Sequence, residues 1–320
     1  MIKFGIQTPQ EGFTFEKLKN IWLECEKLGF ASAWLYDHMQ PIYIQVSSFK
    51  EPLLESWTTL SALATITSQL RIGVLVTCNS FRSPSLLTKI ASTVDNISGG
   101  RLEFGIGCGW FKEEHLAYGL PFSNFTVRIQ QLRESLQIIK KMWSEEISTF
   151  DGKYYSLKNA INYPKPLQKP HPPIWIGGKN MELLKLTAEF ADAWNALYVS
   201  PKEFEEKAKI IKQQCTTIGK DVNKIVLSLT TDVIISKDKN EITKKINKLK
   251  LNNPKKKVRE MPLEEYQEKR IIGTPDQCIE KIYEYINAGV NYFILYFPNA
   301  SEIKPLRFFS ESVMSHFIIK

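Results

Sequence analysis

The alternation of short apolar segments with amphipathic segments constrains the fold of this 320-residue chain more than any other feature. The apolar segments have the length and composition of strands, and the amphipathic ones have helical periodicity. Because repeated βα units place parallel strands in one sheet, eight units predict an α/β fold, a (β/α)8 TIM barrel. The predicted strands are 2–7, 31–36, 71–77, 102–106, 173–177, 192–198, 225–235 and 292–297. The predicted helices lie at about 14–28, 57–69, 84–98, 126–145, 181–190, 201–218, 275–288 and 304–318.

Helix-end signals support this order of elements. Ser83 offers an N-cap with Pro84 at the first helical position, and Gly99-Gly100 ends the apolar stripe that follows. Thr274 begins a capping box that opens a later helix. No block of strands or of helices stands apart, so we expect one barrel domain over residues 1–320.

Two segments interrupt the alternation and are predicted as insertions. Residues 146–172 contain the turn Phe150-Asp151-Gly152-Lys153-Tyr154-Tyr155 between β-forming residues, followed by a proline-rich stretch. Residues 237–272 are rich in lysine, with ten basic residues between Lys237 and Arg259. Long interruptions of a compact domain usually form functional lids or mobile segments.

The net charge of +8 raises the question of nucleic-acid binding. The lysine-rich segment lacks interleaved aromatics, and no helix-turn-helix or RNA-binding signature is present, so we expect no nucleic-acid partner. A solvated helix with a polar loop is the favoured interpretation of that segment, and an anion-binding flap is the alternative. No apolar stretch approaches the ~18 residues of a membrane span, and Met1–Thr8 resembles a strand rather than a leader. Cytoplasmic residence without a membrane partner is the expectation.

The five cysteines are scattered without a C-x-x-C pair, which argues against a disulfide framework and a zinc site. We expect no metal. Cys25, Cys215 and Cys278 lie within or beside predicted helices, and Cys78 and Cys108 follow predicted strands. Free cysteines usually pack as small buried apolar residues, and we expect the same of Cys25, Cys78, Cys108 and Cys278.

Polar and glycine residues gather where the predicted strands end, which in a barrel is where one shared site is built. One predicted strand is followed by Gly177-Gly178-Lys179-Asn180. The glycines let a ligand approach the backbone, the next helix begins here, and Lys179 adds a cation, so this turn has the features of a phosphate site. A plain βα turn is the alternative. A second strand ends in Gly105-Ile106-Gly107-Cys108-Gly109, which lacks the glycine spacing of a Rossmann dinucleotide site. Three glycines at a strand end suggest that the backbone approaches a flat ring system. A tight turn without a ligand is the alternative.

His38 is the histidine best placed for chemistry, because it alone stands at a strand end, beside Asp37. Histidine exchanges protons near neutral pH. A structural histidine is the alternative. His171 and His316 are expected to be structural, and His115 lies in the loop after the fourth strand, where it could contact a substrate.

Several segments together resemble the luciferase-like monooxygenase superfamily. These are Trp34-Leu35-Tyr36-Asp37-His38, Glu55 to Leu60, Arg71 to Pro84, Ile97 to Trp110 and Pro172 to Gly178, with the match resuming at Gly273-Thr274-Pro275. Within the superfamily the chain is most similar to the oxidoreductases that depend on the deazaflavin coenzyme F420.

The resemblance implies hydride transfer between F420 and a small organic substrate, with His38 as the catalytic proton donor. It implies a bulged, cis non-proline peptide near Val74-Leu75. It places the cofactor against Asp37, Val74, Leu75, Thr77, Asn79, Gly107, Cys108, Gly109, Trp110, Ile176, Gly177, Gly178, Lys179 and Asn180. Substrate contacts are expected from Gln7, Phe111, His115 and Trp194, whose aromatics suggest an apolar molecule. We also expect a homodimer.

One difference from the family pattern limits the function that can be inferred from the resemblance. Sugar-phosphate dehydrogenases of the F420 branch carry a catalytic glutamate directly after the glycine turn, where this chain has Trp110, and Glu113 and Glu114 are out of register. A sugar-6-phosphate substrate is therefore not expected. An FMN-dependent monooxygenase or reductase is the first alternative, and a non-catalytic flavin-binding protein is the second.

Overall fold

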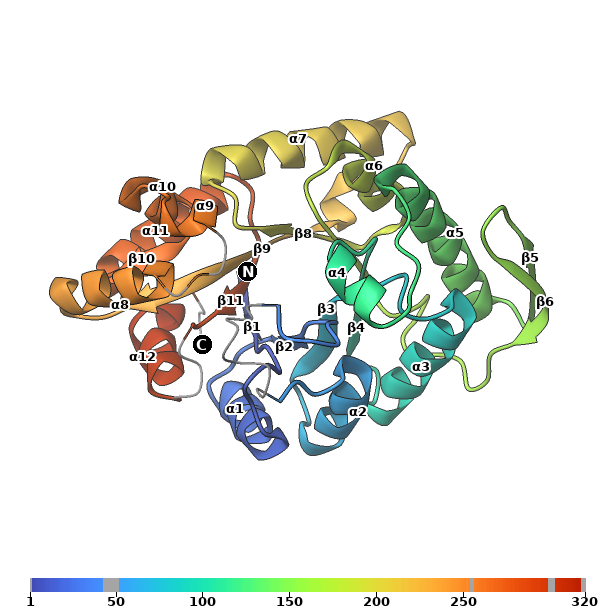
Figure 1. Cartoon of the computed structure of the whole chain (residues 1–320), viewed down its shortest axis with the longest axis horizontal. Coiled ribbons are helices and arrows are strands. Elements are labelled where there is room, and N and C mark those ends of the chain that lie inside the picture. The colour runs from blue at the N-terminus through green and yellow to red at the C-terminus, as the bar shows by residue number, and fades with distance from the viewer. Residues whose placement is uncertain (1, 43–51, 252, 254–255, 299–302, 318–320) are drawn as a thin grey trace.

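Eight parallel strands close into a barrel in the computed structural model of the chain, which describes residues 2–42, 52–251, 253, 256–298 and 303–317 (Figure 1). Each strand pairs with the next around the ring, and the last pairs back onto the first. The predicted barrel is confirmed. In ring order the strands are β1 (Lys3–Gln7), β2 (Ser32–Leu35), β3 (Arg71–Cys78), β4 (Leu102–Gly107), β7 (Ile174–Gly177), β8 (Ala193–Leu197), β9 (Val226–Ile235) and β11 (Tyr292–Tyr296).

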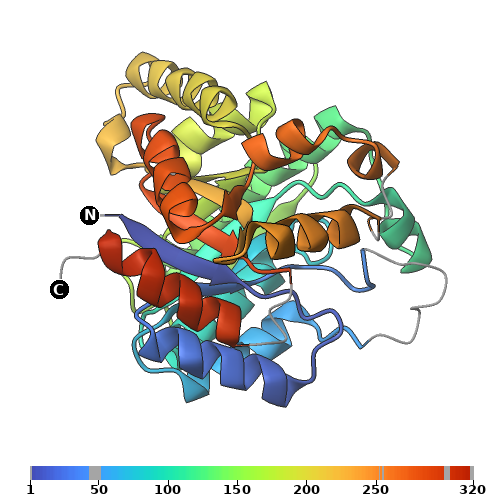
Figure 2. The ribbon, with the colours of Figure 1, turned by 90° about the vertical axis from the view of Figure 1, so that its left-hand side faces the viewer.

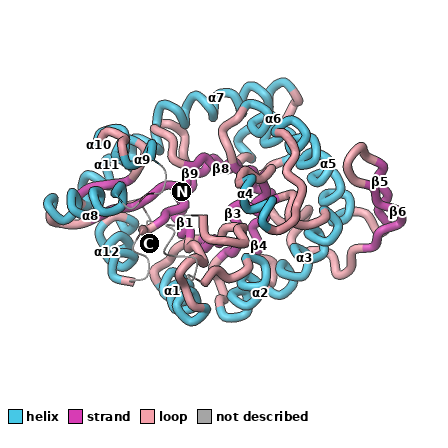
Figure 3. The backbone as a smooth tube through the Cα atoms, viewed as in Figure 1, coloured by secondary structure: helices cyan, strands magenta, loops and turns pink. Residues whose placement is uncertain are grey.

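Helices surround the strands, as the tube in Figure 3 shows. All eight predicted helices are present, and α12 is shorter than predicted because a 3-10 turn, Met314–His316, follows it. In Figures 1 and 2, α12 lies beside α1, and Arg307 Nε donates to Glu24 Oε1 at 2.6 Å. The helices are α1 (Phe15–Lys27), α2 (Ser56–Ile66), α3 (Pro84–Ile97), α5 (Phe125–Ser144), α6 (Met181–Phe190), α7 (Pro201–Thr217), α11 (Pro275–Asn287) and α12 (Lys304–Ser312).

The predicted helix ends are also confirmed. Ser83 Oγ accepts from Leu86 N–H at the start of α3, and Gly99 and Gly100 end the helix with φ values of 67° and 82°. Such positive φ values favour glycine. Thr274 and Gln277 form the capping box of α11.

Aromatic side chains fill the amino-terminal part of the barrel interior. The Trp34 and Trp175 rings lie 4.8 Å apart, and Trp175 lies 5.3 Å from Tyr292. All three are buried. Gly73 on β3 provides the space, because a Cβ there would lie 2.6 Å from the Trp34 ring. This end of the barrel is therefore closed by packing.

The segment 146–172 forms an antiparallel hairpin, β5 (Ile147–Asp151) and β6 (Ser156–Ile161), with the predicted turn at its tip. It projects from the barrel next to α5 in Figure 1. The prediction of a small excursion before the fifth barrel strand is confirmed.

The lysine-rich segment is more ordered than the predicted polar loop. It contains α8 (Lys239–Leu251), α9 (Lys256–Arg259), α10 (Leu263–Glu268) and β10 (Ile271–Gly273), while Lys255 is outside the described residues. β9 continues past the barrel and pairs its last three residues with β10. A small apolar cluster of Ile234, Ile242, Ile246 and Tyr266 holds α8 and α10 against this extension. The solvated helix is present, but packing rather than polarity organises the segment.

None of the helices in the described ranges is both long and apolar enough to cross a membrane. Within the same ranges, no three His, Cys, Asp or Glu side chains gather in an arrangement that could hold a metal ion.

Candidate active site

His38 lies at the carboxyl end of the barrel, after β2, and is held by Glu114 from the segment after β4. Its Nδ1 is 2.9 Å from Glu114 Oε2. The other oxygen of that carboxylate accepts from the backbone N–H groups of Met39, at 2.6 Å, and Gln40, at 3.2 Å. Glu114 belongs to α4 (Lys112–Ala117), a short helix that the sequence did not predict. Glu114 therefore fixes both the ring and the loop of His38.

The pKa of Glu114 follows from these contacts. Burial raises it, but the hydrogen bond and charge of His38 and the two backbone donors outweigh burial, so the pKa is lowered. The carboxylate is ionised at neutral pH and can only accept hydrogen bonds. Nδ1 of His38 therefore carries a proton toward Glu114, and Nε2 is the ring nitrogen left for exchange with a ligand.

Aromatic rings surround His38. Tyr36, Trp110 and Phe111 have ring centroids 5.1, 5.7 and 6.2 Å from the imidazole. Trp110 stacks on Phe111 at 5.1 Å and is 54% exposed. The structure thus brings these two predicted site residues to the predicted histidine and gives the opening an apolar wall.

His115 has a different place from the one predicted. Its Nδ1 is 2.8 Å from the Phe111 carbonyl oxygen and its Nε2 is 2.7 Å from Ser80 Oγ. The Phe81 and Phe122 rings each lie 4.9 Å from it, and it is only 1% exposed. His115 therefore joins α4 to the loop after β3, and its buried ring is not available for the predicted substrate contact.

Asp37 is likewise occupied by protein donors. One carboxylate oxygen accepts from Ser56 Oγ at 2.6 Å and from Arg82 at 3.1 Å. The other accepts from Cys78 N–H at 2.9 Å and from a second Arg82 nitrogen at 2.7 Å. Four donors use the four acceptor sites of a carboxylate. Asp37 thus ties the loops after β2 and β3 together next to His38, and its predicted cofactor contact stays a prediction.

Val76, Gly107 and Gly177 lie together at the ends of β3, β4 and β7, and we call this group the glycine floor. Gly107 and Gly177 end the neighbouring strands β4 and β7. A Cβ on Gly107 would lie 2.8 Å from Val76 Cγ2, and one on Gly177 would lie 3.1 Å from Val76 Cγ1. The glycines therefore make space for the Val76 side chain, which lies where their own side chains would be.

Val76 reaches this position because β3 is bulged. The pairing of β3 with β4 shifts between Val74 and Thr77, and the Leu75-Val76 peptide is cis. The bulge lies where the resemblance implied it, with the cis bond one residue later. Gln7 Nε2 donates to the Leu75 carbonyl oxygen at 3.1 Å, which places both predicted residues beside the floor.

Several predicted site residues point away from the barrel interior. Val74, Thr77, Ile176 and Trp194 have no exposed surface, and Cys108 belongs to the same buried layer as Val74, Ile176 and Trp194, between strands and helices. Successive strand residues face opposite sides, so neighbours of the inward-facing glycines face outward. The side chains of these five residues therefore face the layer between strands and helices, and their predicted ligand contacts stay predictions.

Trp194 still influences the site through the turn after β7. Its Nε1 donates to the Gly178 carbonyl oxygen at 2.7 Å, and its ring packs 4.9 Å from Phe204. Gly178 has a φ of 128°, which favours glycine. Lys179 is exposed, and Asn180 caps α6 by accepting from Glu182 N–H at 3.0 Å. The turn therefore presents a cation and a helix N-terminus, which together favour an anion.

The remaining predicted residues lie near β3. Gly109, with a φ of 75°, passes close to Cys78. Asn79 N–H donates to the Gly107 carbonyl oxygen at 3.0 Å. Burial raises the pKa of the Cys78 thiol to about 12, so it is protonated at neutral pH. All five cysteines are buried and free, as expected for Cys25, Cys78, Cys108 and Cys278.

Comparison with known proteins gives a consistent family. The model of the family described as luciferase-like monooxygenase matches residues 1–292. An F420-dependent glucose-6-phosphate dehydrogenase of Microbacterium testaceum is 25% identical over 98% of this chain and 96% of its own length. A phthiodiolone/phenolphthiodiolone dimycocerosates ketoreductase of Mycobacterium bovis is 25% identical over 67% of this chain and 60% of its own.

Solved structures share the fold. The coenzyme F420-dependent tetrahydromethanopterin reductase from Methanopyrus kandleri superposes with a TM-score of 0.85 at 21% identity, covering 99% of both chains. An F420-dependent secondary alcohol dehydrogenase in complex with an F420-acetone adduct gives a TM-score of 0.83 at 20% identity, covering 98% of both chains. At these identities the likeness concerns the fold.

Proposed function

Because the chain belongs to the luciferase-like monooxygenase family, and relatives along its whole length are named as F420-dependent, we propose that it is an F420-dependent oxidoreductase that acts on a small organic molecule. The observation that carries the proposal is the glycine floor beside a histidine with a fixed tautomer.

The residues present fit a flat tricyclic cofactor with a phosphate-bearing tail. The Val76 side chain, packed over Gly107 and Gly177, offers an apolar surface against which a ring system can lie. The turn at Gly178, with Lys179 next to the N-terminus of α6, suits the phosphate. When bound, F420 would supply the hydride chemistry, and the protein would orient it and exclude water.

His38 would move the proton that accompanies hydride transfer. Glu114 holds the Nδ1 proton, so the exchangeable proton is carried at Nε2. A correctly placed histidine contributes about a hundredfold or more to such a step. Glu114 is therefore a positioning residue for His38, although it stands beyond Trp110, the position where sugar-phosphate dehydrogenases carry their glutamate.

The wall formed by Trp110 and Phe111 favours a substrate with an apolar part next to the reacting carbon. An exposed tryptophan beside His38 offers neither charge nor hydrogen-bond acceptors to a sugar phosphate. We propose an apolar alcohol or ketone rather than a sugar phosphate. The homodimer and the cytoplasmic location stay predictions.

Cofactor titration followed by turnover tests the proposal. F420 should bind about tenfold or more tightly than FMN. Equal affinities, or FMN retained through purification, would favour the FMN-dependent alternative. With oxidised F420 and a panel of secondary alcohols, His38→Ala should lower turnover about a hundredfold while F420 affinity changes little.

His316→Ala is the matched control, since His316 lies outside the barrel opening, 3.0 Å from the Tyr283 hydroxyl, and should leave both quantities unchanged. Normal turnover by His38→Ala would remove the proposed proton-transfer role, which in alcohol oxidation is acceptance of the hydroxyl proton at Nε2. F420 binding without turnover of any substrate by the unchanged protein would favour the flavin-binding alternative.

A further inference from the structure

Leu197, the last residue of β8, faces the barrel interior and is nevertheless 50% exposed. Side chains alternate between the two faces along a strand. Trp194 and Ala196 belong to the buried layer between strands and helices, whereas Ala193 packs with Trp175 inside the barrel. Leu197 therefore points to the same side as Ala193. An interior side chain that is half exposed shows that the barrel is open at the carboxyl end of β8.

Two other strands show the same change from buried to accessible interior residues. Trp175 on β7 and Tyr292 on β11 are buried. Gly177 and Tyr296 lie further along the same two strands and on the same side, and both are half-buried. The interior is thus closed by packed rings at its amino end and accessible at its carboxyl end, where Leu197 offers an apolar surface to a ligand.

The charged side chains on the strand next to Leu197 neutralise each other. Leu197 pairs with Thr230 of β9, and Asp232 lies two residues further along that strand. Asp232 accepts from Arg270 Nε at 2.8 Å and from the Tyr198 hydroxyl at 2.6 Å, and both charged side chains are buried. Because each charge of this pair is compensated by the other, the surface of Leu197 favours an apolar group of a ligand over an ionic one.

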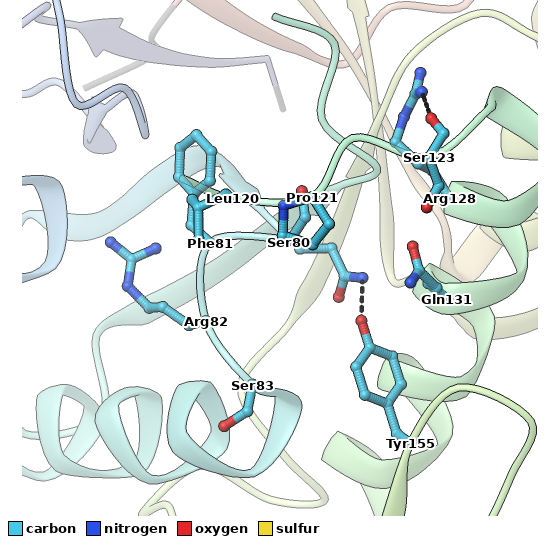
Figure 4. Close-up of a pocket in the computed structure, with 11 residues that line it drawn as sticks. Ser80, Phe81, Arg82, Ser83, Leu120, Pro121, Ser123, Arg128, Gln131 and Tyr155 are labelled. Atoms are coloured by element: carbon cyan, nitrogen blue, oxygen red, sulfur yellow. Dashed lines mark hydrogen bonds between the residues drawn. The ribbon is translucent and has the colours of Figure 1, made fainter. Parts of the chain in front are cut away.

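The pocket beside the end of β3 has a different character. It has a volume of about 310 Å³ and lies between the loop after β3, helix α5 and Tyr155 of the hairpin (Figure 4). Polar side chains predominate in its lining, including Arg128, and the Asn79 amide donates to the Tyr155 hydroxyl at 3.4 Å. An alkyl chain placed there would remove water from these groups without replacing its hydrogen bonds, which costs free energy. The β8 side of the barrel therefore suits an alkyl chain better.

We propose that Leu197 is a specificity-determining residue that contacts the alkyl part of the substrate, and that the substrate is a secondary alcohol or ketone with a chain of several carbon atoms. Trp110 follows β4 and Leu197 ends β8, with β7 between these two strands. Strands two positions apart are separated by about 10 Å, so a chain of several carbons reaches both side chains and a three-carbon molecule does not. The inference deepens the proposed function and rests on it for the reacting group.

Calorimetric titration with ketones from acetone to 2-heptanone, in the presence of oxidised F420, tests the inference, because a ketone and the oxidised cofactor do not react. Affinity should rise about fourfold for each methylene group that becomes buried. Leu197→Ala should weaken binding of 2-heptanone about tenfold and that of acetone less than twofold. Leu86→Ala is the matched control: Leu86 is 54% exposed on α3, outside the barrel, and its removal should leave both affinities unchanged.

A charged replacement gives a test by gain of binding. Leu197→Lys should weaken binding of 2-heptanone and strengthen that of levulinate, a ketone whose carboxylate can pair with the new cation. The same preference for 2-heptanone over acetone in Leu197→Ala as in the unchanged protein would overturn the inference. A tenfold loss of F420 affinity in Leu197→Ala would also overturn it, because the residue would then contact the cofactor.

Turnover separates this inference from the proposed function. With oxidised F420, the ratio of kcat/KM for 2-heptanol to that for 2-propanol should fall about tenfold in Leu197→Ala and stay unchanged in Leu86→Ala. Absence of F420 reduction by every alcohol would refute the proposed function. The ketone titrations, repeated on the protein without F420, would then still decide whether Leu197 contacts an alkyl chain.

Discussion

The two ends of the barrel interior are built from opposite kinds of residue. At the amino end, Trp34, Trp175 and Tyr292 pack ring against ring without solvent exposure. At the carboxyl end, Gly107 and Gly177 leave space for the single side chain of Val76, and His38 follows the end of β2. In barrels of this class the amino end serves stability and the carboxyl end carries the site. Substitutions at the two ends should therefore affect different measurements.

Two buried glutamates repeat this contrast in their pKa values. At the amino end, burial raises the pKa of Glu103 more than its contacts with Arg71 and Trp175 lower it. At the carboxyl end, the hydrogen bonds of Glu114 outweigh burial, and its pKa is lowered. A buried glutamate is thus less readily ionised among the aromatic rings at the amino end. It is more readily ionised at the carboxyl end, where backbone N–H groups donate to the carboxylate.

The largest effect is expected from Trp175→Ala at the amino end. The substitution removes a buried indole and the hydrogen bond from its Nε1 to Glu103, so unfolding should become easier by about 3–5 kcal/mol. Urea unfolding measures this loss. F420 affinity of the remaining folded protein should change little. A large loss of affinity with unchanged stability would contradict the division between the two ends.

A smaller loss is expected from Gly107→Ala at the carboxyl end. The added methyl group would meet Val76, and overpacking of this kind costs about 1–3 kcal/mol. We expect weaker F420 binding together with a modest loss of stability. Val76→Ala in the same protein should restore part of the stability by opening the space. Failure of this rescue would show that Gly107 is needed for a reason other than Val76.

Glu114→Gln should lower turnover about tenfold, because an amide can donate to Nδ1 of His38 and so favour the wrong tautomer.

The effect of Glu114→Gln on stability depends on pH. The folded-state pKa of Glu114 is lowered, so the stabilisation is present above the unfolded-state pKa and is lost as pH falls through the folded-state value. Unfolding measured between neutral and acidic pH should therefore show the stability difference from Glu114→Gln shrinking in acid.

The smallest effect, and of opposite sign, is expected from Glu103→Gln. The folded-state pKa of Glu103 is raised, so its contribution to stability is present below the unfolded-state pKa and is lost as pH rises through the folded-state value. Relative to the unchanged protein, Glu103→Gln should gain stability as pH rises. The same pH series as for Glu114→Gln tests this, and parallel trends for the two variants would refute the contrast between the glutamates.

The fold was accessible from the sequence because apolar periodicity and helix caps are local signals. Ser83-Pro84 and the Thr274 capping box marked helix starts that the structure confirms. β10 was missed because its three residues are too few to show a period, and α4 because its six residues have no N-cap side chain.

The site was accessible only in part, because it depends on which face each residue occupies. His38 could be found from its place at a strand end. Being close to a motif does not tell whether a strand residue faces the barrel interior or the helices. Strict alternation along each strand would have assigned outward positions to Val74, Ile176 and Trp194. Glu114 was set aside as out of register, yet the short helix α4 brings its side chain to His38.

The bulge in β3 decides which residues at the end of this strand face the barrel interior. One extra residue reverses the alternation, so Cys78 pairs with the inward-facing Gly107 and Thr77 with the outward-facing Ile106. A single-codon deletion at Val76 would exchange the two faces for every later residue of the strand. A lineage could thereby replace the lining of its site on this strand in one genetic event, without any substitution.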